Sequence, residues 1–494
     1  MVKQYISTRG KQEPINFYQA IVQGIGNDGG LIVPDFDFTK VDIKKLSKLS
    51  YVDLATEILS TFVPEDGKEL LHQACLEAYG KGLFPSAVVP VEKVGDIYIA
   101  ELFHGQTAAF KDMALSLLPH LMILSLKQLK EEREVLILAA TSGDTGKAAL
   151  EGFKDVAGTS IKVFYPLDGV SEVQKQQMIT QEGKNVEIIG IEGNFDDAQT
   201  AVKQAFGSPE LKALCEEHNV FLSSANSINI GRLIPQIVYY FYSYFTLVKE
   251  GEIILGDTVN FCIPSGNFGN ALAGYFAKQM GLPVGKYICA SNKNNILTDF
   301  FTTGKYDANR EFYKTNAPAM DILVSSNLER LVYFMSGKDG QKVDAYMSKL
   351  KENGVYQVDD EVLQTISEEF KAGMLNEQEV LDTIASCYQE TKYVLDTHTA
   401  IGYGVLKNYQ ETTKDPTKTI LLSTASPYKF PESVYEALYK EKLDVYTAIN
   451  ALYEKTKVAV PKPLQDMKDR EILHKTVIDK TEIIPYIKKK IEDM

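Results

Sequence analysis

The most informative segment of the chain reads His104-Gly105-Gln106-Thr107-Ala108-Ala109-Phe110-Lys111-Asp112-Met113-Ala114-Leu115. Just before it, residues 97–103 are rich in β-branched and aromatic side chains, which predicts a strand. From Met113 to Lys130, leucine and isoleucine recur at helical spacing. Lys111 should therefore lie where a strand gives way to a helix, and in open α/β sheets ligands bind at such junctions.

A lysine in this position has two interpretations. Among apolar groups its charged form is disfavoured, and the neutral amine can then attack a carbonyl to form a Schiff base. Alternatively, Lys111 is an ordinary lysine at a helix start that reaches into water, and for a lone lysine this second case is the commoner one. The other strand-to-helix junctions must decide between them.

Working outward, short β-rich segments alternate with helical ones between about residues 90 and 290. Strands are expected at 135–139, 162–165, 186–190, 220–222 and 258–263, with helices at 146–156, 171–182, 195–206 and 229–248. This alternation predicts an α/β fold with βαβ units and largely parallel sheets. A last strand is expected at 419–424, after a helix at 399–410.

The rest of the chain divides around this region. Residues 1–90 indicate a mixed, mostly helical first unit, with helices expected near 15–25, 51–63 and 67–81. Residues 91–430 form the expected catalytic region, with a smaller subdomain at about 130–230 and a polar, helical insertion at about 294–395. Residues 431–494 are expected to be a charged helical extension.

Composition excludes several classes of partner. The net charge is −14 over 494 residues and no long basic run occurs, so we expect neither nucleic acid nor a membrane as partner. The start lacks an apolar signal region, and no apolar run is long enough to span a bilayer. Five scattered cysteines fit a reducing cytoplasm. His104 and His398 lack carboxylates at ligand spacing, so no metal site is predicted.

Two further junctions have the composition of anion sites. Thr141, Ser142, Asp144 and Thr145 follow one expected strand and open a helix, where free N–H groups and the helix dipole favour an anion. These side chains are equally able to act only as helix caps. Pro264-Ser265-Gly266-Asn267-Phe268-Gly269-Asn270 follows another strand, and its glycines let backbone amides approach a phosphate. A tight structural turn is an equally good interpretation.

The remaining junctions supply polar side chains. Asn226, Ser227 and Arg232 lie between an expected strand and helix, and Arg232 offers a forked donor for a phosphate or carboxylate. A polar cap with a surface arginine is the commoner arrangement. Thr424 ends the last strand, where its hydroxyl can face a ring nitrogen. One lysine with two or three anion cradles fits an aldehyde cofactor that has a phosphate, and pyridoxal 5′-phosphate (PLP) has both groups.

These motifs, in this order, resemble the long form of the threonine synthase family over nearly the whole chain. The most specific pieces are 104–112, 140–146 and 264–270, with 7–9, 29–34 and 423–430 in support. The resemblance implies PLP fold type II, similar to the tryptophan synthase β chain, with two open, mostly parallel sheets and an N-terminal mixed unit. It also implies a carbon–oxygen lyase that converts O-phospho-L-homoserine and water to L-threonine and phosphate in the cytoplasm, as a monomer or homodimer.

The resemblance also implies roles for individual residues. Lys111 would hold PLP as a Schiff base and act as the catalytic base, with Phe110 beside the cofactor and Thr424 facing the pyridine nitrogen. Asp144 would lie near the cofactor 3′ oxygen, where two anionic oxygens would share a proton. The cofactor phosphate would be held by Gly266, Asn267, Phe268, Gly269 and Asn270. The substrate carboxylate would be bound by Thr141, Ser142 and Thr145, and the substrate phosphate by Asn226, Ser227 and Arg232.

Three other functions compete with this one. The nearest is another fold type II enzyme, such as a serine/threonine dehydratase, which releases ammonia rather than phosphate. A non-catalytic sensor of a phosphorylated ligand is a second possibility, although it has no need of Lys111. A nucleotide-binding protein would require a nucleotide-type phosphate loop, and the glycines at 266 and 269 do not form one.

Overall fold

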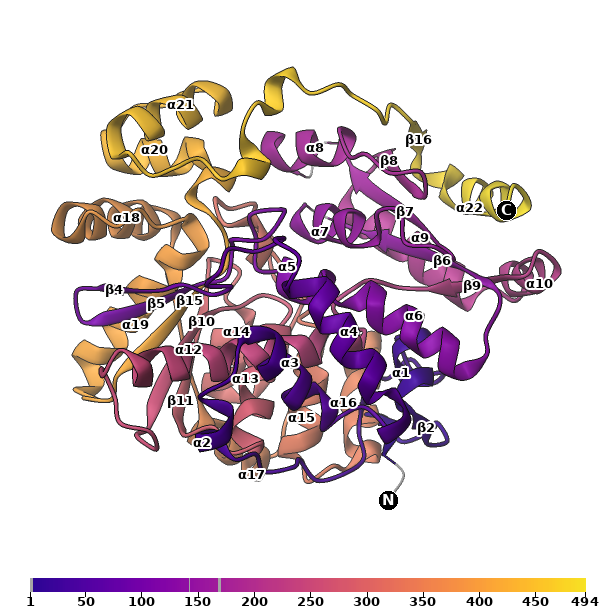
Figure 1. The fold of residues 1–494 in the computed structure, drawn as a ribbon, viewed down its shortest axis with the longest axis horizontal. Helices are drawn as coiled ribbons and strands as arrows, with labels where there is room; N and C mark the ends of the chain where they lie inside the picture. Colours follow the sequence, from indigo (N-terminus) through magenta and orange to yellow (C-terminus); the bar gives the residue numbers. More distant parts are fainter. Residues whose placement is uncertain (1–2, 142, 168–169) are drawn as a thin grey trace.

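Two sheets lie side by side in the computed structural model, which describes residues 3–141, 143–167 and 170–494 (Figure 1). The larger sheet has the order β14-β11-β10-β15-β5-β4, with bounds Phe370–Met374, Val284–Ser291, Val259–Pro264, Thr419–Ser423, Ile97–Glu101 and Val91–Val94. All neighbours in it are parallel except the antiparallel pair β4 and β5. The predicted class, mostly parallel α/β, is confirmed.

The smaller sheet is wholly parallel. Its order is β16-β8-β7-β6-β9, with bounds Val477–Asp479, Val186–Glu192, Thr159–Pro166, Glu134–Ala140 and Val220–Ser223. Helices α7 (Asp144–Phe153), α8 (Glu172–Ile179), α9 (Phe195–Gly207) and α10 (Pro209–Glu217) connect its strands. Each predicted strand of this region is present within a few residues of its expected bounds.

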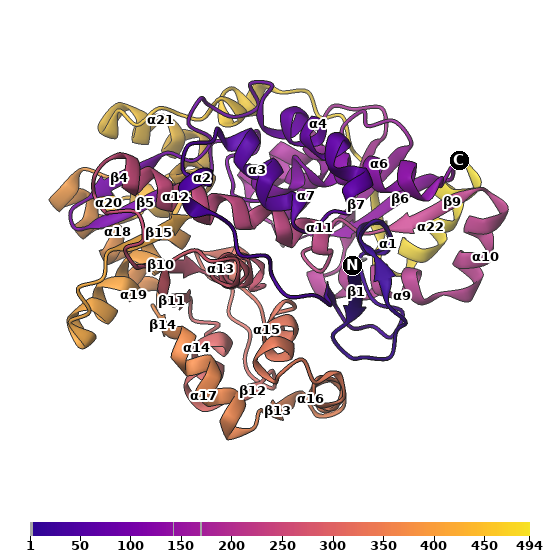
Figure 2. The ribbon, with the colours of Figure 1, turned by 60° about the horizontal axis from the view of Figure 1, so that its bottom comes forward.

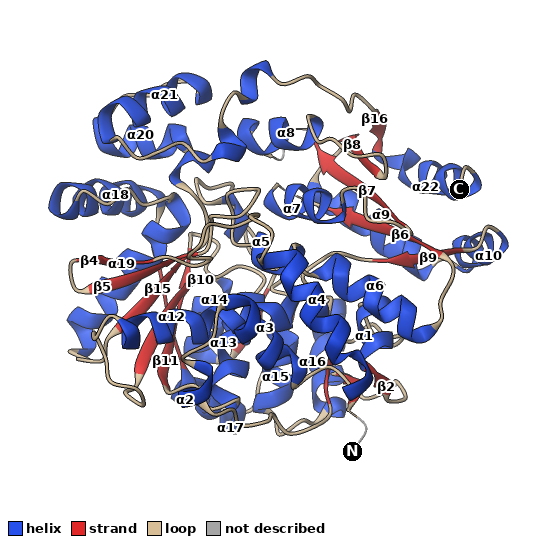
Figure 3. Cartoon of the chain, in the orientation of Figure 1, coloured by secondary structure: helices blue, strands red, loops and turns tan. Residues whose placement is uncertain are grey.

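The direction of the strands determines where the loops meet. The strands β10, β15 and β5 are parallel neighbours, so their carboxyl ends lie at one edge of the larger sheet. The strands β6 and β9 are parallel neighbours in the smaller sheet. Figure 3 shows the loops that follow these strands gathered between the two sheets, near α5 (Asp112–Leu115). Ligands of open α/β sheets bind at carboxyl ends of this kind.

Both central strands are apolar because helices cover both faces of the sheet. Every residue of β10 and of β15 is buried. Helix α19 (Thr397–Thr413) packs against β10, β11 and β15, while α12 (Ile237–Lys249) and α13 (Gly269–Gln279) pack together. None of the helices among the described residues is long and apolar enough to cross a bilayer.

The N-terminal unit begins with a small antiparallel sheet. It consists of β2 (Ile15–Asn16), β1 (Gln4–Ser7) and β3 (Ile32–Pro34), followed by α2 (Ile43–Leu46), α3 (Tyr51–Ser60) and α4 (Lys68–Tyr79). The expected helix at 15–25 is shorter, as α1 (Phe17–Gln23), because Asn16 forms a capping box with Gln19 and leaves 15–16 extended.

Two long predicted helices are interrupted. The expected helix from 113 to 130 is divided into α5 and α6 (Leu118–Leu129), with Pro119 in the first turn of the second helix. The expected helix at 229–248 consists of α11 (Ile230–Leu233), a 3-10 turn at Ile234–Gln236 that contains Pro235, and α12. Proline is tolerated in a first helical turn but not in a helix interior, because it lacks the N–H group.

The segment 294–395 is not purely helical. Besides its helices, it contains a short antiparallel pair of strands, β12 (Lys305–Asp307) and β13 (Val355–Gln357), seen low in Figure 2. The helices of this segment are α14 (Ile296–Thr303), α15 (Leu328–Met335), α16 (Gly340–Asn353), α17 (Asp360–Glu369) and α18 (Glu377–Thr391). Strand β14 belongs to this segment and extends the larger sheet beside β11. It was not predicted because its sequence, Phe-Lys-Ala-Gly-Met, has little β preference.

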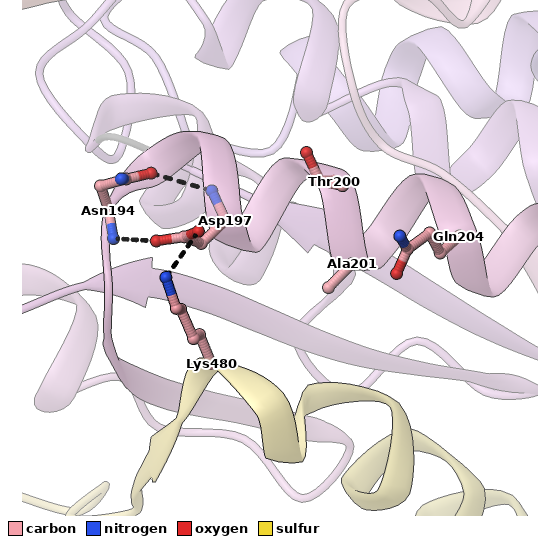
Figure 4. Close-up of a pocket in the computed structure, with 6 residues that line it drawn as sticks. All are labelled: Asn194, Asp197, Thr200, Ala201, Gln204 and Lys480. Atoms are coloured by element: carbon pink, nitrogen blue, oxygen red, sulfur yellow. Dashed lines mark hydrogen bonds and ion pairs between the residues drawn. The ribbon is translucent and has the colours of Figure 1, made fainter.

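The C-terminal segment likewise contains a strand among its helices. After α20 (Pro431–Tyr439) and α21 (Val445–Thr456), β16 pairs with β8, and α22 (Ile483–Glu492) packs on α9. Lys480 Nζ donates to Asp197 Oδ1 at 3.2 Å. Figure 4 shows this contact beside the capping box that Asp197 forms with Asn194. The charged residues that line the shallow pocket drawn there, Asp197 and Lys480, are thus paired with each other. This ion pair helps to attach the end of the chain to helix α9, which covers the smaller sheet.

Candidate active site

Lys111 lies at the start of α5, at the predicted junction. Its side chain is half-buried, and Nζ is 5.0 Å from the centre of the Phe110 ring. Burial lowers the pKa of Lys111 to about 8; Asp144 and Asp112 oppose this shift, while Arg232 and Lys429 add to it. Near neutral pH a larger share of this amine is therefore uncharged than for an ordinary lysine.

The backbone before Lys111 is attached to the end of β15. The Phe110 N–H donates to the Thr424 carbonyl at 2.8 Å, and the Ser426 N–H donates to the Ala108 carbonyl at 3.1 Å. Ala109 and Ala425 form an isolated antiparallel bridge. The structure therefore brings Lys111, Phe110 and Thr424 together, although 312 residues lie between Lys111 and Thr424 in the chain.

A buried carboxylate shapes the loop in front of Lys111. Asp112 accepts from the Thr107 N–H at 2.8 Å and from the Thr107 hydroxyl at 2.6 Å. Burial raises the pKa of Asp112 to about 6, and these two bonds oppose the shift. A side chain at Gly105 would place Cβ 2.5 Å from an Asp112 oxygen, so only glycine fits this turn.

The loop after β10 turns tightly into α13. Phe268 has a left-handed backbone (φ +62°), and its ring packs against Phe301 and Phe370. A Cβ at Gly266 would lie 2.9 Å from the Ala319 carbonyl. Among the described residues, no side chain caps the amino end of α13, so the first N–H groups of this 11-residue helix remain available to an anion.

Three buried polar atoms near this loop have no hydrogen-bond partner within the described part of the chain: Ser265 Oγ, Asn270 Nδ2 and Arg232 Nε. Asn270 Oδ1 accepts from the Tyr239 hydroxyl at 2.7 Å and the Tyr240 hydroxyl at 2.8 Å, which fixes the amide and leaves Nδ2 as the unpaired donor. Buried donors normally have partners. The residues present therefore fit a phosphorylated ligand whose oxygens accept these hydrogen bonds.

A second cradle follows β9. Arg232 is buried, and its Nη1 donates to the Ala225 carbonyl at 3.0 Å. Burial lowers the pKa of Arg232 to about 10, and no acidic group among the described residues offsets this effect. Asn226 and Ser227 are half-buried in the same loop, and Ser227 Oγ lies 3.5 Å from Ser326 Oγ. A buried guanidinium with an unpaired Nε can bind an anionic group.

The loop after β6 uses its threonine internally. Thr141 Oγ1 donates to the Gly143 carbonyl at 3.1 Å and accepts from the N–H groups of Gly143 and Gly146. The structure thus gives Thr141 the capping role that the sequence also allowed, while Thr145 is half-buried at the helix start. Ser142 lies outside the described residues. A role in binding the substrate carboxylate stays a prediction for all three.

Sequence reasoning missed Lys429, which is completely buried. Its Nζ lies 2.9 Å from Asp144 Oδ1, and Gln174 Nε2 donates to the same oxygen at 3.0 Å. Asp144 thus already has a cation beside it, and the proton that it would share with the cofactor 3′ oxygen stays a prediction. Lys429 stands in a Tyr-Lys-Phe context that gives no local sign of burial against α7.

Sequence reasoning also missed the residues that join the two cradles. Asn327 Nδ2 donates to the Asn267 carbonyl at 3.0 Å and to the Ser227 carbonyl at 3.2 Å. The guanidinium of Arg330, which is completely buried, bonds to Asn327 Oδ1, to the Ile228 carbonyl and to the Ile32 carbonyl of β3. One arginine therefore holds the N-terminal unit and both cradles together.

The two histidines do have carboxylate neighbours, contrary to expectation. His104 Nε2 is 2.6 Å from Glu101 Oε2, and His398 Nδ1 is 3.1 Å from Asp396 Oδ1. His398 Nε2 also accepts from the Ala319 N–H at 3.2 Å. Each histidine thus has one carboxylate partner. Within the described ranges, no group of three or more histidine, cysteine, aspartate or glutamate side chains is placed to bind a metal ion.

Comparison with known proteins accords with this geometry. Residues 4–79 match the family described as "Threonine synthase N terminus", residues 83–424 match "Pyridoxal-phosphate dependent enzyme", and residues 399–483 match "Threonine synthase, C-terminal". The chain belongs to the threonine synthase family of PLP-dependent enzymes. Its cofactor is therefore pyridoxal 5′-phosphate.

Similar sequences carry this family's name. The chain is 36% identical to threonine synthase of Saccharomyces cerevisiae and 38% identical to that of Pseudomonas aeruginosa; each match covers 88% of this chain, and 89% and 90% of those proteins. It is 39% identical to threonine synthase-like 1 of Homo sapiens over 88% of its own length. The chain spans only 60% of that longer relative.

Solved structures of threonine synthases have the same fold as this chain. PLP-bound threonine synthase from Brucella melitensis has a TM-score of 0.87 at 35% identity and covers 99% of each chain. Threonine synthase from yeast has the same TM-score at 33% identity, covering 100% of this chain and 99% of that one. The expected PLP fold type II is confirmed.

Proposed function

We propose that the chain is a threonine synthase, which converts O-phospho-L-homoserine and water to L-threonine and inorganic phosphate. The observation that supports this most strongly is a pair of anion cradles joined to each other beside one perturbed lysine. Asn327 bonds to the carbonyls of both Asn267 and Ser227, and Arg232 is close enough to affect the pKa of Lys111. One cradle suits the cofactor phosphate, and the second suits the phosphate of a substrate.

In this proposal the residues divide into three groups. The loop of Gly266, Asn267, Phe268, Gly269 and Asn270 holds the cofactor phosphate through its free N–H groups and the Asn270 amide. Phe110 and Thr424 contact the cofactor ring, and Asp144 lies beside it with Lys429. The substrate phosphate is bound by Asn226, Ser227 and Arg232, and its carboxylate by the 141–145 loop.

Bound PLP supplies the electron sink for carbon–hydrogen cleavage next to the amino group. Lys111 Nζ, as a neutral amine, accepts the proton from the substrate Cα and can return protons later. Overall one Cβ–H bond and the Cγ–O bond break, and the oxygen of water bonds to Cβ. Of the two protons released, one from Cβ and one from water, one is taken up by Cγ and the other by the departing phosphate. Arg232 balances the charge of the phosphate before and after it leaves, since no carboxylate in the described part of the chain neutralises its guanidinium.

The state of the cysteines bears on the cellular compartment. All five cysteines are buried free thiols. We propose a cytoplasmic enzyme on this basis, because the reducing cytoplasm keeps such thiols unpaired.

The decisive experiment compares two products. The purified full chain with PLP should release phosphate and L-threonine in equal amounts from O-phospho-L-homoserine, and no ammonia from L-threonine or L-serine alone. Ammonia release without phosphate release would instead identify a dehydratase.

The phosphate cradle can be tested separately through KM. R232M should raise the KM for O-phospho-L-homoserine roughly tenfold or more, because it removes a charge-assisted contact worth about 1.5–3 kcal/mol. R133M is the control: Arg133 pairs with Glu131 before β6, away from the cradles, and its loss should leave KM unchanged. An unchanged KM in R232M would remove Arg232 from the substrate site.

A further inference from the structure

A second lysine, more deeply buried than Lys111, lies beside the candidate active site. Lys429, in the 3-10 turn Pro427–Lys429 after β15, is completely buried. Its Nζ lies 2.9 Å from Asp144 Oδ1, donates to Gln177 Oε1, and lies 3.4 Å from the Thr107 carbonyl. These three acceptors, from three different segments, fix the ammonium group in one place.

Asp144 is equally enclosed. It opens α7, is 5% exposed, and receives the Gln174 amide at 3.0 Å on the oxygen that also faces Lys429. Burial alone would raise the pKa of this carboxyl, but attraction to Lys429 and then to Lys111 outweighs burial and holds the pKa well below its usual range. Asp144 is thus favoured as an anion by two lysines, and of these two Lys429 forms an ion pair with it.

The charged groups with the largest influence on the pKa of Lys111 come from α5 itself and from three surrounding elements. Asp144 on α7 and Asp112 on α5 attract its proton, whereas Arg232 on α11 and Lys429 after β15 repel it. The ammonium of Lys111 lies over the Phe110 ring, and Lys111 has no ion pair with either carboxylate among the described residues. The position that would pair with Asp144 is already filled.

We propose that Lys429 is a positioning residue which occupies Asp144 as its fixed counter-ion and so prevents Lys111 from pairing with that carboxylate. Without Lys429, Lys111 would be the lysine left to balance the buried Asp144, since these two lysines are the cations with the largest influence on that carboxyl. A buried carboxylate left alone is strongly unfavourable, so Lys111 would be drawn to it in its protonated form. A protonated amine can neither attack an aldehyde nor accept a proton.

This inference deepens the proposed function and rests on Lys111 as its reactive amine, but it concerns a different property. It says why that amine is available in a pocket that contains an anion close by. Lys429 acts only through Asp144 and Lys111 and need not touch the substrate. The prediction is therefore about the protonation of Lys111, which can be measured without turnover.

The test is competitive labelling of the full-length, cofactor-free chain with trace acetic anhydride over a range of pH, with the Lys111 peptide quantified by mass spectrometry. In K429M the labelling midpoint of Lys111 should move to higher pH, and its reactive fraction at neutral pH should fall about tenfold for every pH unit by which the midpoint rises. K429R keeps the charge and should keep the midpoint. K429M/D144N removes both charges and should return the midpoint to or below that of the unchanged chain.

K147M is the matched control. Lys147 is also a buried lysine of this region, but its own carboxylate partner is Glu151, at 2.9 Å, and it is not among the groups with the largest influence on the pKa of Lys111. The K147M substitution should lower the free energy of unfolding but leave the labelling midpoint of Lys111 unchanged. K429Q serves as a second variant if K429M fails to fold, since glutamine keeps a polar donor at this position but has no charge.

An unmoved Lys111 midpoint in the folded Lys429 variant would overturn the inference. So would a K429M/D144N midpoint as high as that of the single variant. Neither result depends on substrate, so the proposed synthase reaction can fail while this inference holds, and the reverse.

Discussion

Lys111 is the residue on which the proposed chemistry depends. K111A should bind PLP only loosely, lack the visible absorbance of a lysine-bound cofactor, and give no turnover, because the amine that would bond to the cofactor is gone. The absorbance spectrum before and after borohydride, with mapping of the labelled peptide, measures this. K111R tests the alternative that charge alone matters; turnover by either variant would contradict the central role of this amine.

The pKa of Lys111 predicts how cofactor uptake depends on pH. Burial lowers this pKa from 10.5 to about 8, and the neutral amine is the reactive form. The rate at which the cofactor-free chain gains the PLP absorbance should therefore rise with pH and level off above about pH 8. A rate that kept rising toward pH 10 would show an ordinary lysine.

The same pKa change affects stability with a definite sign. Between about pH 8 and pH 10.5 the unfolded chain retains the proton that folded Lys111 has lost. The unfolded state then binds more protons, so the contribution of Lys111 to the free energy of unfolding rises with pH across this window. Chemical unfolding of the cofactor-free chain at several pH values should show this slope, and K111M should lack it.

At the scale of single residues, the sequence was informative where chemistry and local pattern coincide. Lys111, Asn270 and Arg232 each stand at a junction between an apolar strand and a helix, and the structure places each at such a junction. Lys429 and Arg330 gave no signal, because the acceptors that bury them lie in distant segments. Burial of a charged side chain is a property of tertiary contacts rather than of neighbours in sequence.

Among the elements, the loop between β10 and α13 leaves no space for a side chain at Gly266. In G266A the new Cβ would lie 2.9 Å from the Ala319 carbonyl, so the loop must move away from the amide positions that suit a phosphate. PLP affinity, measured by absorbance titration, should fall about tenfold or more, equivalent to ~1.4 kcal/mol. G207A is the control, since nothing lies within 4 Å of its Cβ at the end of α9. Equal affinities in the two variants would refute the argument.

Helix α15 contributes the arginine that joins three segments. R330M leaves the Ile32, Ile228 and Asn327 oxygens without their buried donor, and we expect unfolding to become easier by about 3 kcal/mol and substrate KM to rise. R310M is the control: Arg310 is partly exposed, and its partners Asp299, Asn295 and the Asp307 carbonyl all belong to the 294–395 segment, so its loss should leave substrate KM unchanged. Denaturant unfolding and steady-state kinetics measure both effects; a KM that stayed constant would show that Arg330 supports the fold but not the cradles.

Elements were predictable in proportion to their length and periodicity. The buried strands β6 and β10 were expected because their sequences are nearly all apolar, and β7 because its second half is rich in β-branched and aromatic residues. Strands β14 and β16 were not, because one contains lysine and glycine and the other has three residues. Both lie at sheet edges, where pairing with one neighbour suffices and the sequence need not be apolar on both faces.

In the whole molecule, two parallel sheets direct their carboxyl ends toward one region. Alternation of strands and helices predicted the sheets, and parallel pairing requires their loops to gather at one edge. Which sheet each strand joins was beyond the sequence: β15 lies between β5 and β10 although it comes near the end of the chain. That insertion brings Thr424 and Lys429 to Lys111, so the active site exists only when the C-terminal third has folded.

The end of the chain should therefore stabilise the smaller sheet without taking part in chemistry. Ile483, Ile487 and Ile491 of α22 are completely buried in the apolar cluster beneath β6 and β8. I487A should lower the free energy of unfolding by about 2–5 kcal/mol, because it leaves a cavity in that cluster. I484A should lower the free energy of unfolding by less, because the Ile484 side chain is only partly buried against the same cluster. Because α22 contacts α9 and α10 rather than the loops around Lys111, kcat of I487A at a temperature where it stays folded should be unchanged. A large loss of kcat in the folded variant would show instead that α22 helps to set the position of the 141–145 loop.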